Sequence, residues 1–121
     1  GTSFTIRARL GVLHFQTLPF ARTSNARTTA YHAYSHYDAV ANRRLVGESD
    51  LPIRHGFQRY TLWGEGQHKG YPVRFGIVGY SSENRRVFVR ALWFLEAGDN
   101  IGPVLEGACS SLRVAPASQS E

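Results

Sequence analysis

The chain has 121 residues, of which 42% are hydrophobic and 12% aromatic, and its formal net charge is +5 at pH 7. This length fits a single domain over residues 1–121, and the composition excludes an intrinsically disordered chain. No apolar run approaches the roughly 20 residues that a membrane-spanning helix needs, so no membrane span is expected. The one cysteine, Cys109, cannot form an intrachain disulfide.

The positive charge comes from thirteen arginines and a single lysine, Lys69. Arginine pairs bidentately with phosphates and carboxylates, so nucleic acid, an anionic membrane or an acidic protein are all conceivable partners. The arginines are scattered along the chain and do not form one block, a distribution that favours solvated strand faces over a dedicated anion-binding segment.

Residues 4–18 open the chain with an alternation of apolar and polar side chains that is typical of a β-strand. Gly11 interrupts the alternation, so the segment is either one bent strand or a short hairpin. Pro19 ends it, because proline cannot donate a hydrogen bond to a sheet ladder. Residues 22–27 are a polar connector.

Residues 26–45 can be interpreted in two ways. Helical spacing places several apolar side chains on one stripe, with Ser24 as N-cap and two arginines in the last turn. A period of two instead separates tyrosines from histidines and predicts extended chain with a turn at Ala41 and Asn42. We favour the helix; the extended alternative would convert the domain into an all-β barrel or meander.

The next segments predict a loop over 47–56, a strand over 57–63 and a glycine-rich turn over 64–70. Residues 71–96 then read as two strands joined by a turn at 81–84. Residues 91–95 are apolar on both sides of the second strand, which requires a cover on each face of the sheet.

Asp99 or Asn100 is expected to cap a closing helix that continues to Leu112, and residues 115–121 read as a frayed tail. The predicted fold is therefore α+β: an antiparallel sheet of four to five strands, flanked by two helices at 26–45 and 100–112.

Two short motifs suggest a family. The run Lys69-Gly70-Tyr71-Pro72-Val73 is similar to the entry into the central hairpin of the PsbP-like fold family, and the run 108–113, Ala-Cys-Ser-Ser-Leu-Arg, is similar to that family's closing motif. Leu112 stands where the family usually has Phe, and the resemblance covers roughly the second half of the chain. It implies a non-catalytic module, periplasmic or secreted, of the kind associated with the bacterial cell envelope or with secretion.

His32 and His36 are candidates for metal binding or catalysis. On a helix they project from the same face, at a spacing that suits two imidazoles on one zinc ion, with Asp38, His55 or His68 as a third ligand. The alternative is that both histidines are ordinary surface residues. A small enzyme or metal-binding protein centred on this pair is thus one hypothesis, although no catalytic motif accompanies the pair and no cofactor is expected.

Binding of a macromolecule is the other hypothesis. Arginines beside exposed tyrosines would suit a nucleic acid, but no ribonucleoprotein-type aromatic motif is present. Tyr and Arg also dominate the hot spots of protein interfaces, so another protein is the favoured partner and a non-enzymatic accessory or protein-binding module the favoured function. The predicted partner-binding residues are Tyr31, Tyr34, Tyr37, Arg43, Arg44, Arg85 and Arg86.

Overall fold

The computed structural model describes residues 3–8, 11–18, 25–83 and 85–95. These residues form one helix and six strands. Among them, no helix is long and apolar enough to cross a membrane. In chain order the elements are β1 (Ser3–Ala8), β2 (Gly11–Leu18), α1 (Ala26–Ser35), β3 (Ala41–Arg54), β4 (Phe57–His68), β5 (Tyr71–Ser81) and β6 (Arg86–Phe94).

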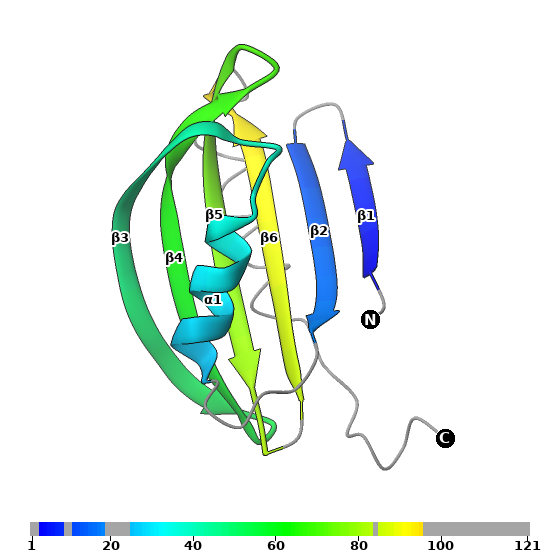
Figure 1. Cartoon of the computed structure of the whole chain (residues 1–121), viewed down its shortest axis with the longest axis vertical. Helices are drawn as coiled ribbons and strands as arrows, with labels where there is room; N and C mark the ends of the chain where they lie inside the picture. Colours follow the sequence, from blue (N-terminus) through cyan, green and yellow to red (C-terminus); the bar gives the residue numbers. More distant parts are fainter. Residues whose placement is uncertain (1–2, 9–10, 19–24, 84, 96–121) are drawn as a thin grey trace.

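The six strands form one open antiparallel sheet in the order β1-β2-β6-β5-β4-β3 (Figure 1). The β1–β2 hairpin pairs with the last strand, so the chain must cross the sheet between β2 and β3. Helix α1 lies on this crossing and packs on β5, β4 and β6. Strand β3 therefore occupies one edge of the described sheet and β1 the other.

Two tight turns connect the long strands β3, β4 and β5. His55 and Gly56 have φ angles of 52° and 80°, and Lys69 and Gly70 have φ angles of 51° and 84°. Positive φ at both central residues is what a two-residue type I′ hairpin turn requires, because its twist matches that of the strands. Glycine at the second position adopts this conformation without a steric penalty.

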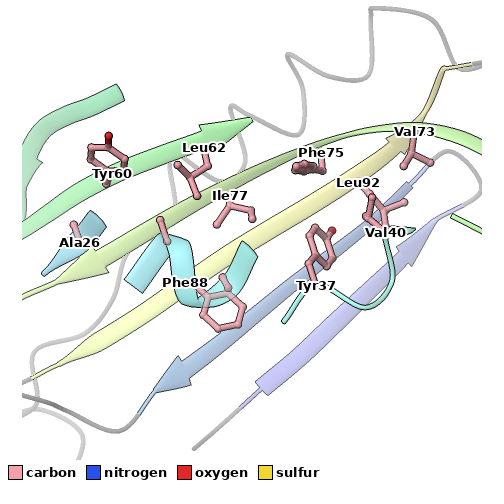
Figure 2. Packing of buried hydrophobic residues seen from close by; sticks show 12 residues of the cluster. Ala26, Tyr37, Val40, Tyr60, Leu62, Val73, Phe75, Ile77, Phe88 and Leu92 are labelled. Carbon is pink, nitrogen blue, oxygen red and sulfur yellow. The ribbon is translucent and has the colours of Figure 1, made fainter. Parts of the chain in front are cut away.

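The main core lies between α1 and the sheet (Figure 2). Ala30 and Ala33 of α1 are fully buried against side chains that point from β4, β5 and β6 toward the helix. The ring of Phe75 lies at the centre of this layer, stacked on Tyr34 at 5.8 Å between centroids and in edge contact with Tyr37 at 6.0 Å. The strand side chains in this layer are Tyr60, Leu62, Val73, Phe75, Ile77, Phe88 and Leu92.

A second apolar cluster covers the opposite face of the sheet. Val89, Ala91 and Trp93 of β6 are buried there, next to Val78 and Tyr80 of β5. The prediction that β6 is dry on both faces is confirmed for Ala91, Leu92 and Trp93. The predicted closing helix over 100–112, proposed as a cover for the sheet, lies outside the described residues.

The prediction of an antiparallel sheet with helical cover is confirmed in its coarse form, but the sheet has six strands, and one helix is found within the described residues. The helix predicted over 26–45 is wrong beyond Ser35. Its N-cap is Asn25, whose side-chain oxygen accepts a hydrogen bond from the backbone N–H of Thr28. The hydroxyl of Thr28 in turn accepts one from the backbone N–H of Asn25. Residues 41–45 belong to β3, because pairing with β4 replaces the helical hydrogen bonds that their spacing favoured.

The loop predicted over 47–56 is also mostly strand, since β3 continues to Arg54. The glycine-rich turn predicted over 64–70 is confined to Lys69 and Gly70. Gly64 and Gly66 lie within β4, where a Cβ would come within 2.1 Å of the Arg44 carbonyl oxygen and 2.4 Å of the Val40 side chain, respectively. Glycine at these two positions lets β4 lie close to Arg44 and Val40, and neither position is part of a turn.

Candidate functional site

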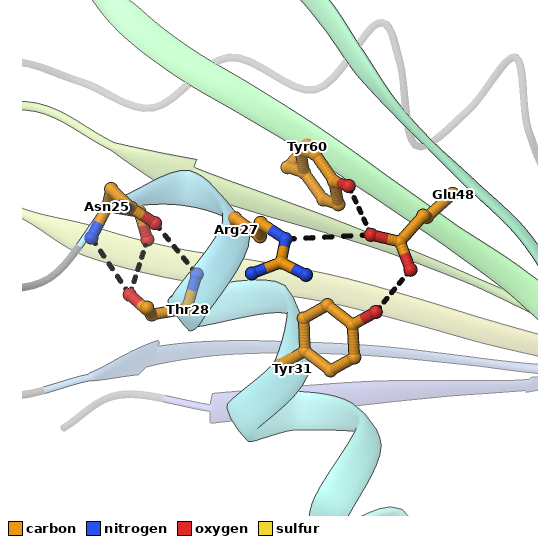
Figure 3. A network of polar contacts seen from close by, with 6 residues as sticks. All are labelled: Asn25, Arg27, Thr28, Tyr31, Glu48 and Tyr60. Carbon is orange, nitrogen blue, oxygen red and sulfur yellow. Dashed lines mark hydrogen bonds and ion pairs between the residues drawn. The ribbon is translucent and has the colours of Figure 1, made fainter.

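Glu48 of β3 connects the edge strand to the helix. Its carboxylate accepts hydrogen bonds from the phenols of Tyr31 on α1 and Tyr60 on β4 (Figure 3). Arg27 lies beside them, with Nε 3.5 Å from the same carboxylate and its guanidinium 5.0 Å from the centroid of the Tyr31 ring. This network positions α1 next to β3 and defines the surface between them.

The electrostatics of this network favour fixed charges over proton transfer. Hydrogen bonds from Tyr31 and Tyr60, together with Arg27, lower the pKa of Glu48 below its ordinary value of 4.5. The same hydrogen bonds raise the pKa of Tyr31 and of Tyr60 above 10.0. At neutral pH the carboxylate is charged and the phenols are neutral, so none of these groups is poised near pH 7 as a general acid or base requires.

Tyr31, Tyr34 and Tyr37, which were predicted as partner-binding residues, have different environments. Tyr31 is partly buried and donates to Glu48, while Tyr34 is partly buried and stacks on Phe75. Tyr37 is 3% exposed and belongs to the core, so its predicted surface position is wrong. The helix ends before Tyr37, and the following turn directs this ring inward over Phe75.

The four predicted arginines do not form one patch. Arg43 and Arg44 lie near the end of the sheet that contains Gln67 and Pro72, whereas Arg85 and Arg86 lie at the opposite end, opposite Ser81. The length of β5 separates the two pairs by roughly 30 Å.

These arginines also have partners within the fold. Arg43 donates from Nη1 to the carbonyl oxygens of Tyr37 (2.7 Å) and Val40 (2.9 Å), which secures the chain after α1. Arg86 donates from Nε to Thr29 Oγ1 at 3.2 Å. Arg44 is exposed and pairs with Glu65.

His32 and His36 are adjacent, as their spacing predicts. Their ring centroids are 4.5 Å apart, and Nδ1 of His36 lies 2.9 Å from the carbonyl oxygen of His32. No group of three or more His, Cys, Asp or Glu side chains among the described residues is arranged to hold a metal ion. The predicted pair is therefore brought together, and the part of the chain that the structure describes supplies no third ligand for a zinc site.

The surface that the sequence analysis missed is the edge strand itself. Val46 and Ile53 of β3 are 59% and 72% exposed. Trp63 of the neighbouring strand β4 is partly exposed and lies over Gly47, where a Cβ would come within 2.3 Å of the indole. Residues 47–56 were predicted as a loop, so these side chains were not considered as parts of a sheet edge. The sequence over 46–51, Val-Gly-Glu-Ser-Asp-Leu, has no alternation of apolar and polar side chains that would have identified it as a strand.

A hollow of about 590 Å³ lies beside the last part of β3, where the N-terminal end of α1 approaches β4. It combines apolar surface from Leu51 and Ile53 with charges of both signs, and it adjoins the Glu48 network through Arg27 and Tyr60. The lining residues are Asn25, Ala26, Arg27, Asp50, Leu51, Ile53, Gln58, Arg59 and Tyr60.

No family model matches this chain, and no curated protein matches its sequence. Among solved structures, the fold is similar to that of PA94, a protein of unknown function from Pseudomonas aeruginosa that has been suggested to be a regulator. The TM-score is 0.64 at 14% sequence identity, over 95% of this chain and 83% of that one. At this identity the similarity establishes the fold and leaves the function open.

Proposed function

We propose that this chain is a non-enzymatic accessory module that binds an extended segment of a partner protein along the edge strand β3. The observation that carries the proposal is the position of β3 at the edge of the described sheet, with Val46 and Ile53 exposed on it. An edge strand offers unpaired backbone groups to a second chain, and exposed apolar side chains on such an edge are usually avoided unless they serve an interaction.

The pairing pattern of β3 limits where a partner strand would fit. Its register with β4 shifts between Ala41 and Arg44, between Leu45 and Gly47, and between Leu51 and Arg54, so the uninterrupted stretch runs over residues 47–51. Pro52 follows this stretch directly, and proline within a sheet is typical of an edge strand because it has no backbone N–H to donate. A partner segment would pair over this short stretch and place its next side chain in the hollow lined by Leu51, Ile53 and Tyr60.

The polar groups near this edge suit binding better than catalysis. Glu48 and Arg27 are held as fixed charges by Tyr31 and Tyr60. The resemblance to PsbP-like modules independently suggests a non-catalytic role, and the association with the bacterial cell envelope or with secretion that it implies is part of this proposal.

The test begins with peptides selected on the purified chain from a display library. Amide hydrogen exchange, followed by NMR, should slow by about tenfold over residues 47–51 when a selected peptide is added, because new strand pairing protects the backbone. The amides of β1, at the other edge, are the internal control. Protection confined to β1, or spread evenly over the sheet, would contradict the proposal.

Substitutions provide a second readout of the same proposal. The Val46→Glu/Ile53→Lys variant should bind the selected peptides about tenfold more weakly, since it removes the exposed apolar contacts on β3. Tyr71→Lys is the matched control, because Tyr71 is an exposed apolar residue outside β3, at the start of β5. Equal weakening in the control and the β3 variant would argue against the edge strand as the site.

A further inference from the structure

The two sides of α1 face different surroundings. Tyr31 reaches toward β3 and β4, where it meets Glu48. On the other side, Thr29 and Ala33 accept hydrogen bonds from Arg86 and Arg90 of β6, and the strand beyond β6 is β2. The helix therefore separates the surface proposed above from a second one.

This second surface collects basic side chains from three elements. His32 and His36 of α1 are exposed, and His14 of β2 contacts Arg90 of β6, whose Nε lies 3.0 Å from Nδ1 of His14. Arg86 and Arg90 both act electrostatically on His32 and lower its pKa, after the larger effect of burial. We call His14, His32, His36, Arg86 and Arg90 the basic cluster.

Among the described residues, charges of both signs lie near Arg90. The carboxylate of Asp38, in the turn after α1, stabilises the positive charge of Arg90, whereas the guanidinium of Arg43 on β3 destabilises that charge. The guanidinium of Arg90 also lies over the ring of Tyr37 at 4.4 Å and over that of Phe88 at 5.0 Å. The cluster thus concentrates like charge beside one exposed side of the helix, an arrangement that costs stability and that an anion would relieve.

The protonation of the two contacted histidines follows from their partners. Arg90 Nε can only donate, so His14 Nδ1 accepts and its ring proton lies on Nε2. The carbonyl oxygen of His32 can only accept, so His36 donates from Nδ1.

We propose that the basic cluster binds an acidic segment of a partner protein, whose Asp or Glu carboxylates accept hydrogen bonds from the imidazoles beside Arg86 and Arg90. A divalent metal at His32 and His36 fits less well, because the two arginines repel a cation. A compact phosphate also fits less well, because Nε and Nη1 of Arg90 are occupied by His14 and by the Ala33 carbonyl oxygen, which breaks up its bidentate fork.

Binding at the cluster should strengthen as the pH falls, because protonation of an imidazole adds positive charge and a hydrogen-bond donor to the cluster. The probe is a fluorescein-labelled peptide of alternating Glu and Ser, followed by fluorescence anisotropy. We expect its affinity to be about tenfold higher at about pH 6 than at about pH 7.5. A peptide of alternating Gln and Ser that bound equally well would overturn the proposal.

The His32→Gln/His36→Gln variant should bind the acidic peptide weakly and with little dependence on pH. His55→Asn is the matched control, since it removes a histidine in the β3–β4 turn and keeps a residue type that tolerates positive φ. In the unmodified chain, addition of the acidic peptide should raise the pKa of His32 measured by NMR, a readout that does not require a variant to fold.

Three outcomes would overturn the proposal. They are an unchanged pH dependence in the double variant, no movement of the His32 pKa, and tighter binding of tripolyphosphate or single-stranded DNA than of the peptide with the same dependence on the histidines. None of these outcomes bears on the β3 edge, because that surface lies on the other side of α1.

Discussion

At the scale of single residues, three arginines outside α1 donate hydrogen bonds to the helix or to the chain that leaves it. Arg86 bonds Thr29 near the first turn, Arg90 bonds the Ala33 carbonyl oxygen, and Arg43 bonds the carbonyl of Tyr37. The guanidinium suits this role because it presents several donors in a rigid fork and remains charged when partly buried. Three of the thirteen arginines thus help to fix the helix and the chain that leaves it.

The contact between His14 and Arg90 makes folding sensitive to pH. Burial, followed by the charge of Arg90, lowers the pKa of His14 below its ordinary value of 6.5. The unfolded chain then binds more protons than the folded chain, so this contribution is fully present above pH 6.5 and is lost as the pH falls toward the lower folded pKa.

We therefore expect the free energy of unfolding, measured with urea, to decrease between about pH 7 and about pH 5, and to decrease less steeply in a His14→Gln variant. His32 has a lowered pKa as well, so some dependence should remain in that variant. A His55→Asn variant should follow the unmodified chain, and equal slopes in all three proteins would contradict the role assigned to His14.

At the scale of elements, the distance between α1 and the sheet is set by a glycine. A Cβ at Gly79 of β5 would lie 2.4 Å from the carbonyl oxygen of Ala26 and 2.6 Å from the backbone nitrogen of Ala30. Backbone atoms cannot move aside as a flexible side chain can. Gly76, three residues earlier on the same strand, faces Trp93, and a Cβ there would have 3.9 Å of space.

A Gly79→Ala substitution should therefore destabilise the fold by about 1–3 kcal/mol, as overpacking in a core does. Gly76→Ala is its control and should change stability by less than about 0.5 kcal/mol, because the added methyl group makes an ordinary contact. The measurement is the urea midpoint and slope of each variant. Similar midpoints for the two variants would show that α1 does not pack against Gly79 as closely as the structure indicates.

At the scale of the whole molecule, β5 and β6 are buried on both faces while the edge strand β3 is mostly exposed. Core residues such as Ile77 and Leu92 point toward α1, and Val89 and Trp93 point the other way. Strand β3 has most of its residues exposed, although it pairs with β4 along much of its length. Local stability should therefore be highest in the central strands β5 and β6 and lowest at the edge, because opening a strand that is buried on both sides exposes the most apolar surface.

Native-state hydrogen exchange should accordingly give the highest protection for the amides of β5 and β6 and the lowest for those of β3 and β1. We expect the central and edge strands to differ by at least about 100-fold in protection, equivalent to roughly 3 kcal/mol. If β3 exchanged as slowly as β5, the edge would be more stable than the structure indicates, and its availability to a partner strand would be in doubt.

The sequence by itself predicted those features that depend on local periodicity. The alternation over 71–95 identified β5 and β6 and the need to cover both faces, and helical spacing over 26–45 placed Ala30 and Ala33, which the fold buries, on one apolar stripe. The spacing of His32 and His36 also predicted their contact, because two residues four apart on a helix are neighbours.

Only the tertiary structure decided the remaining features. Residues 41–54 carry both helical and loop-like signals, and pairing with β4 made them a strand. The same pairing brought Glu48 to Tyr31 and Tyr60, and the order of the strands divided the predicted arginines between two ends of the sheet. Contacts between residues far apart in the chain depend on which strands meet, and local periodicity carries no information about that choice.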